Sequence, residues 1–308
     1  MENIISVSGL HKRFGETHAV RGIDFEVDGG SLFAFLGQNG AGKSTTINML
    51  LGLLQPDGGR IDYSAFGSFE NFKREIGVVF QNNVFDDFLT VEENLLLCGE
   101  LYLRDAKAAR TRLSALCELL SLGEVLKKRF RTLSGGQQRK AEIARALFHT
   151  PRMLFLDEPT TGLDPKTRAE VWQLLHEIRR EGGMTIFLTT HYMEETADAD
   201  KVVILHRGEK VCEGSPAELK AAYSQDRLRI TPKDAAALEN ALTERGCTFE
   251  RIAAHYAVTI QSTAESIALL YALRENVRFY EAVKGSMDDV FLNAVGENIG
   301  TVPEGGQG

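Results

Sequence analysis

Cysteine is scarce in this chain of 308 residues, which contains only four. Cys98, Cys117, Cys212 and Cys247 lie far apart, so no C-x-x-C pair suggests a structural zinc site. The same spacing gives no sign of a disulfide framework. We therefore interpret the four residues as buried free thiols in a reducing cytosol.

Long apolar runs are also missing. No window approaches the roughly 18 apolar residues that a transmembrane helix needs. The first ten residues, MENIISVSGL, lack the basic segment and the apolar stretch of a signal peptide. We expect no direct membrane insertion, so a membrane process would need another chain to cross the bilayer.

Basic residues are not in excess, because 35 Lys and Arg face 43 Asp and Glu, for a net charge of -8. Binding to nucleic-acid phosphates needs clustered cations, so we expect no nucleic-acid partner. What is present is an ordinary globular composition, 43% hydrophobic and 25% charged. The length allows one large domain and a smaller one.

Short apolar runs alternate with amphipathic segments in the first part of the chain. The runs 32–36, 153–156 and 186–188 each end at a polar loop, which is typical of strands buried on both faces of a parallel sheet. One helix is predicted to start after Asp164, with Pro165 at its first position, and to end at Gly182. The pattern predicts an α/β nucleotide-binding core.

The domain limits follow from where this alternation changes. Residues 1–222 form the predicted core, with a helical subdomain inserted at about 88–132. Residues 226–296 have the order strand, helix, two strands, helix, strand, which predicts a small α+β ferredoxin-like domain and then a helix that Ser286 and Asp289 can cap. Residues 297–308 are predicted to be a disordered tail. For the small domain we favour a structural or dimer-stabilising role, with regulatory and passive roles left open.

The stretch GQNGAGKST matches the phosphate-binding pattern G-x-x-x-x-G-K-[ST]. In such a loop backbone N–H groups surround a β-phosphate, Lys43 reaches the β and γ phosphates, and the Ser44 hydroxyl ligates magnesium. The loop follows the strand-like SLFAFL and precedes a helix-compatible run, the context that the motif requires. The candidate nucleotide-binding residues are Gly37, Gln38, Asn39, Gly40, Ala41, Gly42, Lys43, Ser44 and Thr45.

An acidic pair ends the next apolar run, MLFLDE. Asp157 fits the strand-end position that holds magnesium in P-loop enzymes. Glu158 points elsewhere and, beside a γ-phosphate, could polarise the attacking water. For this segment alone, two solvated acids are the simpler interpretation. Gln81 after IGVVF and His191 after TIFLTT are equally ambiguous when each is taken singly.

A second candidate anion site lies in LSGGQQRKAEIARAL. Ser134 can cap a helix there, Gln137 can complete a capping box, and Gly135 and Gly136 allow close approach of another molecule. A helix N-terminus of this kind binds anions. The structural alternative, that these residues only begin a helix, holds equally well.

An aromatic residue, a P-loop, a glutamine after a strand, LSGGQ, an acidic pair, TGLD and a strand-end histidine occur once each in this order. The series resembles the ATPase subunit of ATP-binding cassette (ABC) transporters over residues 1 to about 222. The resemblance implies that ATP and Mg²⁺ are bound and that ATP hydrolysis drives transport. Gln38, where proline is frequent, and Phe14, in place of tyrosine, are mild departures.

The resemblance also implies residue roles. Phe14 stacks on adenine, Gln81 couples magnesium and the γ-phosphate to the membrane partner, Glu158 is the catalytic base, Asp164 lies at the dimer seam and His191 contacts the γ-phosphate. The implied catalytic residues are Glu158, His191, Lys43 and Gln81, and the implied magnesium ligands are Ser44, Gln81 and Asp157.

In this family two cassettes meet head to tail. The resemblance therefore implies that Ser134, Gly135 and Gly136 close over the ATP of a partner chain. The implied partners are a second ATPase subunit, as a homodimer or a paired cassette, and separate transmembrane permease subunits. The implied location is the cytoplasmic face of the cell membrane, reached through those subunits.

The run from Thr189 to Pro216 and the ending SMDDVFLNAVG resemble the exporter branch that includes antibiotic-resistance and multidrug pumps. An importer ATPase is the first alternative. A soluble ABC protein that acts on DNA or ribosomes is the second, but only 52 residues separate Gln81 from Ser134 and the chain has one cassette. That interval leaves no room for a long coiled coil.

Overall fold

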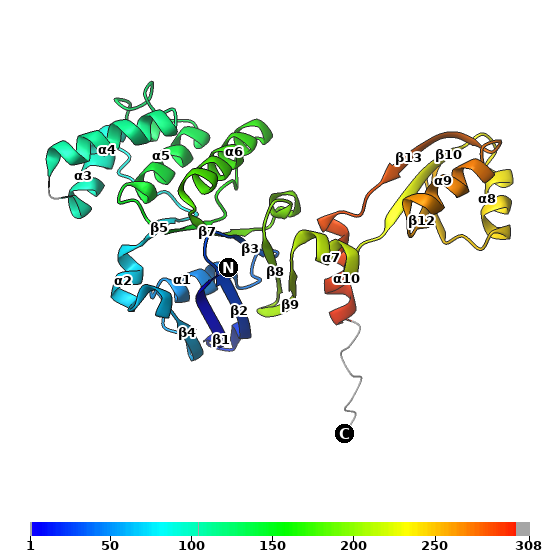
Figure 1. The fold of residues 1–308 in the computed structure, drawn as a ribbon, viewed down its shortest axis with the longest axis horizontal. Coiled ribbons are helices and arrows are strands. Elements are labelled where there is room, and N and C mark those ends of the chain that lie inside the picture. Colours follow the sequence, from blue (N-terminus) through cyan, green and yellow to red (C-terminus); the bar gives the residue numbers. More distant parts are fainter. Residues whose placement is uncertain (1, 104, 300–308) are drawn as a thin grey trace. The chain divides into compact units, whose positions relative to one another are not determined.

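The computed structural model describes residues 2–103 and 105–299. They form two compact units that divide between Glu213 and Gly214 (Figure 1). The sequence placed the end of the core later, at residue 222. The difference is helix α7 (Pro216–Tyr223), which packs against α10 (Met287–Ile299) of the second unit.

A six-stranded sheet with the order β5-β6-β7-β3-β8-β9 forms the centre of the first unit. The pairs β5–β6, β6–β7, β3–β7 and β3–β8 are all parallel, as the apolar runs predict. Strands β3, β6 and β7 are buried along their whole length. The bounds are β3 (Leu32–Leu36), β5 (Ile76–Val79), β6 (Met153–Asp157), β7 (Thr185–Thr190), β8 (Lys201–His206) and β9 (Glu209–Gly214).

A second, antiparallel sheet of the first unit has the order β2-β1-β4. Its strands are β1 (Asn3–Phe14), β2 (Thr17–Asp28) and β4 (Gly58–Asp62). Side chains of β2 meet the parallel sheet, because the Phe25 ring lies 4.9 Å from the Phe35 ring, centroid to centroid. Phe33 and Phe187 stack at 4.9 Å in the same cluster. This aromatic core fixes the strands whose ends carry the predicted site.

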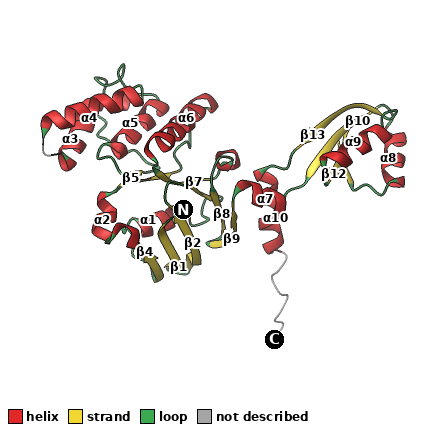
Figure 2. Cartoon of the chain, viewed as in Figure 1, coloured by secondary structure: helices red, strands yellow, loops and turns green. Residues whose placement is uncertain are grey.

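Helices connect the strands of the first unit (Figure 2). Helix α6 begins at the N-cap Asp164, has Pro165 in its first turn and ends at Gly182, as predicted. The predicted helical subdomain at about 88–132 consists of α3, α4 and the short helix η2. The bounds are α1 (Lys43–Leu50), η1 (Ser64–Phe66), α2 (Phe69–Arg74), α3 (Val91–Tyr102), α4 (Ala106–Leu119), η2 (Phe130–Thr132), α5 (Gly135–Leu147), α6 (Pro165–Gly182) and η3 (Met193–Thr196).

The second unit has the predicted element order and a four-stranded antiparallel sheet ordered β11-β12-β10-β13. This is the ferredoxin-like arrangement. Apolar side chains of the sheet and of α8 and α9 form its core, including Leu228, Leu238 and Val258. The bounds are β10 (Asp226–Pro232), α8 (Ala235–Glu244), β11 (Phe249–Ile252), β12 (His255–Ile260), α9 (Thr263–Ala272) and β13 (Val277–Val283).

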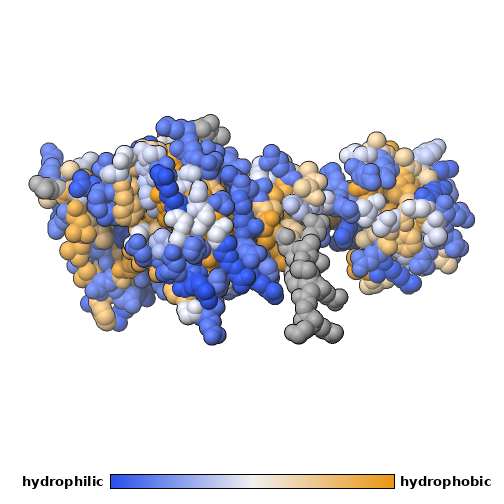
Figure 3. Space-filling model, turned by 90° about the horizontal axis from the view of Figure 1, so that it is seen from below, coloured by the Kyte–Doolittle hydropathy of each residue, from blue (hydrophilic) through white to orange (hydrophobic). Residues whose placement is uncertain are grey.

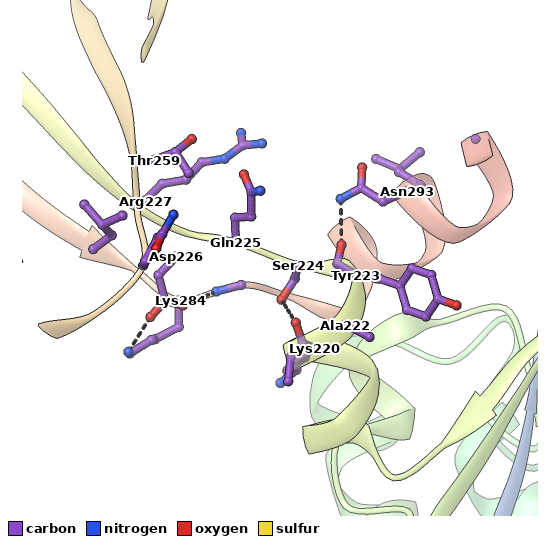
Figure 4. Close-up of a pocket in the computed structure, with 16 residues that line it drawn as sticks. Lys220, Ala222, Tyr223, Ser224, Gln225, Asp226, Arg227, Thr259, Lys284 and Asn293 are labelled. Carbon is purple, nitrogen blue, oxygen red and sulfur yellow. Dashed lines mark hydrogen bonds and ion pairs between the residues drawn. The ribbon is translucent and has the colours of Figure 1, made fainter. Parts of the chain in front are cut away.

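The two ends of the ferredoxin-like part meet side by side, between α7 and α10. Figure 4 shows Asp226 facing Lys284, which donates a hydrogen bond to it at 2.5 Å. The backbone N–H of Gly285 donates to the same carboxylate at 3.0 Å. Asn293 of α10 donates to the Tyr223 carbonyl at 2.7 Å. The segments that enter and leave the sheet are therefore tied to each other.

Helix α10 begins as predicted, because Ser286 and Asp289 bond each other's backbone N–H groups at 3.1 and 2.9 Å. The prediction that the tail starts at residue 297 is wrong, since α10 continues to Ile299. Residues 300–308, the rest of that tail, lie outside the described residues. All four cysteines are free, but each is partly buried rather than fully buried. Within residues 2–103 and 105–299 no helix has the length and apolarity to cross a membrane.

Candidate active site

The phosphate-loop motif lies between the carboxyl end of β3 and the start of α1. Gly42 is the N-cap of α1 with φ of 103°, a left-handed conformation that favours glycine. A Cβ atom on Gly42 would lie 2.5 Å from the Ala19 carbonyl, and one on Gly37 would lie 2.5 Å from the Leu205 carbonyl. The loop can therefore take this tight path only with glycine at both positions.

Lys43 is a buried cation, with 4% of its side chain exposed. Its Nζ donates to the carbonyls of Gly37 at 2.7 Å and Gln38 at 3.2 Å. The same atom lies 3.1 Å from Glu158 Oε1. The ammonium thus has three partners in the chain, and they hold it against the loop that would surround a phosphate.

Ser44 and Asp157 meet as the magnesium hypothesis requires. The Ser44 hydroxyl donates to Asp157 Oδ1 at 3.1 Å, and the Thr189 hydroxyl donates to the same oxygen at 2.5 Å. Hydroxyl and carboxylate oxygens are the ligands that magnesium prefers, and magnesium keeps several waters besides. The residues present fit that ion, although no group of three or more His, Cys, Asp or Glu side chains could hold a metal in the described part of the chain.

Glu158 follows β6 with φ of 47°, an uncommon backbone conformation for a residue with a side chain. Its carboxylate accepts a hydrogen bond from Thr161 at 3.0 Å and lies 3.2 Å from His191 Nδ1, at the end of β7. Burial acts to raise the pKa of Glu158, but the Lys43 ammonium, its hydrogen bond, Thr161 and His191 together lower that pKa below its usual value. The carboxylate is therefore ionised at neutral pH.

A single hollow collects most of the predicted nucleotide-binding residues. Phe14, half exposed at 51%, Gln81 and Glu158 line it together with the loop residues Asn39, Gly40, Ala41, Gly42, Lys43, Ser44 and Thr45. Sequence reasoning missed five others there, namely Thr17, His18, Ala19, Arg21 and Arg207. Gly37, Gln38, Asp157 and His191 do not line the hollow, but they contact residues that do.

The second candidate anion site is formed separately. Ser134 caps α5, and its capping box with Gln137 is present, as the structural alternative predicts. A Cβ on Gly136 would lie 2.2 Å from Thr167 Cγ2, so α6 packs directly on this glycine. Asp164 accepts from the Thr167 N–H at 3.1 Å. None of Ser134, Gly135, Gly136 and Asp164 is among the residues that line the hollow around Lys43.

Helix α5 also makes hydrogen bonds to the loop that contains Gln81, and the sequence analysis did not predict these contacts. Arg139 donates to the carbonyls of Phe80 at 2.7 Å and Gln81 at 3.2 Å. Glu142, buried to 1% exposure, accepts from the N–H groups of Val84 at 2.8 Å and Phe85 at 3.2 Å. The sequence does contain a signal for these contacts, because Arg139 and Glu142 are charged residues on the buried, otherwise apolar face of α5.

Comparison with known proteins agrees with this geometry. The family model described as ABC transporter matches residues 20–161, and a model of AAA domains matches residues 127–196. The chain belongs to the ABC transporter family. It is an ATP-binding subunit of such a transporter and an ATPase.

Relatives from several bacteria match nearly the whole chain. The daunorubicin/doxorubicin resistance ATP-binding protein DrrA of Streptomyces peucetius is 36% identical over 305 residues, 95% of this chain and 92% of the relative. The Nod factor export ATP-binding protein I of Burkholderia lata is 34% identical over 300 residues, 96% of this chain and 98% of the relative.

A solved structure shows the assembly of a similar cassette. The dimeric, post-hydrolysis state of an ATP-binding cassette bound to ADP and Pi has a TM-score of 0.61 and 27% identity, with 68% of this chain and 98% of that chain covered.

Proposed function

We propose that this chain is the ATPase of an exporter, in which two cassettes sandwich two MgATP and drive a substrate through separate transmembrane subunits. The observation that carries the proposal is that relatives named for drug resistance and for Nod factor export match both units of the chain. A peripheral location at the cytoplasmic face of the cell membrane, through those subunits, follows from the same proposal.

In this function the residues predicted from the sequence have defined tasks in and around the hollow. The loop from Gly37 to Thr45 and Lys43 bind the phosphates, and Phe14 offers an exposed ring to the adenine. Ser44, Asp157 and Gln81 would hold Mg²⁺, which neutralises phosphate charge. Glu158 accepts the proton of the attacking water, a role that its ionised state allows.

The second anion site serves the ATP of the partner chain. Its residues are separate from the hollow that contains Lys43, and the N-terminus of α5 offers N–H groups beside two glycines. The dimeric state of a similar cassette supports this arrangement. Each of the two sites would then combine Lys43 of one chain with Ser134 of the other.

An apolar groove of the first unit suits the membrane partner. It runs between α3 and the end of β5, and its apolar lining includes Leu53, Phe80, Leu101 and Tyr102. Leu53 and Leu101 are 63% and 81% exposed. Figure 3 shows apolar, orange surface at the end of the first unit that carries α3. A membrane subunit that covers this groove would bury these side chains.

A mixing experiment tests the shared sites. Lys43→Ala and Ser134→Arg chains, each also carrying Glu158→Gln to slow hydrolysis, are purified separately, mixed and assayed for ATP retained by closed dimers. Each variant alone has two damaged sites, whereas a mixed dimer has one site without either lesion. Retention only in the mixture supports the proposal. No gain in mixed dimers that are shown to form would contradict it.

Purification of the native complex tests the direction of transport. The full chain is tagged in its own cell, extracted in mild detergent and its co-purifying membrane subunit identified. ATP-dependent transport is then measured in vesicles with the ATPase sites facing outward. Export in the cell corresponds to uptake into such vesicles. Recovery with a solute-binding protein would instead favour an importer.

A further inference from the structure

Two neighbouring glutamates that follow β7 have opposite environments. Glu194 has 66% of its side chain exposed and accepts a hydrogen bond from Arg168 at 2.8 Å. Glu195 is 4% exposed. Both of its oxygens accept from hydroxyl groups, since Thr160 donates to Oε1 and Thr190 donates to Oε2 at 2.5 Å. No ion pair is recorded for Glu195 in the described part of the chain, so these two hydroxyls are the partners that replace its hydration.

The two threonines flank the residues proposed to act on the attacking water. Thr160 lies two residues after Glu158, and Thr190 immediately precedes His191. Both threonines are 1% exposed. Thr190 Oγ1 also accepts from the Tyr192 N–H at 2.9 Å, which fixes the chain on the far side of His191. One buried carboxylate therefore ties the segment after β6 to the segment after β7.

The His191 ring contacts the ring of its neighbour Tyr192, with the centroids 4.1 Å apart. The His191 ring is 27% exposed, and Nδ1 lies 3.2 Å from Glu158 Oε2 without the alignment of a hydrogen bond. The position of the ring is set by this contact and by the backbone of residues 190–192, which is anchored through Thr190. A buried carboxylate that loses its hydroxyl partners is unfavourable, so the anchored arrangement is strongly preferred over looser ones.

We propose that Glu195 is a positioning residue that holds His191 against Glu158 by binding Thr160 and Thr190 together. Glu195 does not line the hollow around Lys43, and it acts through these two side chains. The inference rests on the proposed roles of Glu158 and His191. Glu195 is not part of the sequence motifs from which the site was predicted, and its role is inferred from its hydrogen bonds.

The first experiment compares Glu195→Ala with the control Glu177→Ala, because Glu177 accepts a hydrogen bond from Gln173 on α6 at 3.0 Å and does not line the hollow. Loss of Glu195 should lower kcat for ATP hydrolysis by on the order of 10- to 100-fold, because misplacement of a reacting group by about 1 Å costs that much. ATP affinity should change by less than about twofold, since Glu195 does not line the hollow. Glu177→Ala should leave both constants near wild type, since it removes a hydrogen bond between two side chains on the surface of α6. Equal losses in the two variants, or a loss confined to ATP affinity, would overturn the proposal.

Glu195→Gln separates position from folding. The amide keeps the size of the side chain, its oxygen accepts from one threonine, and its NH₂ can donate to the other hydroxyl oxygen. Turnover within about threefold of wild type is expected. Thermal unfolding of all variants is followed in parallel, so that a misfolded Glu195→Ala protein is recognised. A folded Glu195→Gln protein that loses as much turnover as Glu195→Ala would contradict a positional role.

A double-mutant cycle with His191→Ala tests the route. Single-turnover hydrolysis of radiolabelled ATP keeps slow residual rates measurable. If Glu195 acts through His191, adding Glu195→Ala to His191→Ala lowers the rate little further. If the rate loss of the double variant equals the product of the two single losses, Glu195 acts independently of His191. That result overturns the inference about Glu195 and leaves the proposed ATPase function in place. An unchanged rate in His191→Ala removes the proposed role of His191, and with it the route, while Glu158→Gln tests the ATPase site by itself.

Discussion

The two units of the chain bury different kinds of side chain. The first unit buries Lys43, Arg139, Glu142, Asp157, Glu158 and Glu195. In the described part of the second unit the buried residues are apolar apart from Ser266, and its charged pairs, such as Arg229 with Glu281, are exposed. Both units are folded around apolar cores, so the buried charges are additional to what folding requires.

This difference indicates where function lies. Burying a charge is costly unless it is paired or hydrogen-bonded. In the first unit every one of these six side chains has such a partner. These partners offset part of the cost of burial, and they fix the positions of the side chains proposed to bind phosphate and to accept a proton. The described residues of the second unit include no comparable arrangement of buried charged side chains.

The largest expected effect is on chemistry in the first unit. Glu158→Gln should retain ATP binding and lose about 10²- to 10⁴-fold in hydrolysis, because an amide cannot accept the proton of the water. Phosphate release and equilibrium ATP binding measure the two quantities. Glu177→Gln, on the surface of α6, is the control. Hydrolysis within twofold of wild type would remove Glu158 from the role of base.

The next effect is on the core of the second unit. Leu228 is fully buried there, and Leu228→Ala should destabilise that unit by about 2–5 kcal/mol. Hydrogen exchange of residues 226–283 and nucleotide binding are measured at the same denaturant concentrations. Nucleotide binding should persist after the second unit has unfolded, because the contacts of the hollow all lie in the first. Coincident loss of both would show that the units unfold together. Leu292→Ala, which removes an exposed side chain, is the control.

Local sequence signals predicted the elements that depend on neighbours in the chain. The apolar run 32–36 is β3, and Asp164, Pro165 and Gly182 delimit α6. The capping box of Ser134 is present. These features were predictable because turns, caps and buried runs are determined within a few residues.

Contacts between distant segments could not be predicted in this way. The buried Arg139 reaches the Phe80 and Gln81 carbonyls, 59 and 58 residues away. Glu195 lies 35 residues from Thr160. A charged residue in a helix or short turn gives no local indication of which backbone it will meet. The contacts of Arg139 and Glu195 could therefore be found only from the three-dimensional structure.

A smaller effect is expected where α5 holds the Gln81 loop. Arg139→Lys keeps the charge but cannot reach both carbonyls with the fork of a guanidinium. Hydrolysis should fall on the order of tenfold, since a hydrogen bond from a charged group contributes about 1.5–3 kcal/mol. The apparent Mg²⁺ requirement should rise if Gln81 is a ligand. Lys140→Ala, which removes a partly exposed pair between Lys140 of α5 and Glu170 of α6, is the control. A loss no larger than that of the control would mean that the loop keeps its position without Arg139.

The smallest effect is expected for an exposed pair of the second unit. Arg229 and Glu281 lie 3.0 Å apart on neighbouring strands, and about half of each side chain is exposed. Water screens such a pair, so Arg229→Ala should cost less than about 1 kcal/mol of unfolding free energy, and less still at high salt. Chemical denaturation of the full chain, followed by hydrogen exchange in residues 226–283, measures this cost. The matched Glu281→Ala variant and the double variant complete a cycle, in which a coupling above about 1 kcal/mol would contradict the expectation. Neither residue lines the hollow around Lys43, so ATP hydrolysis should stay at the wild-type rate. A marked fall in hydrolysis would instead indicate that the sheet surface around Arg229 and Glu281 takes part in the transporter complex. The proposed contrast between a catalytic first unit and a structural second unit would then be wrong.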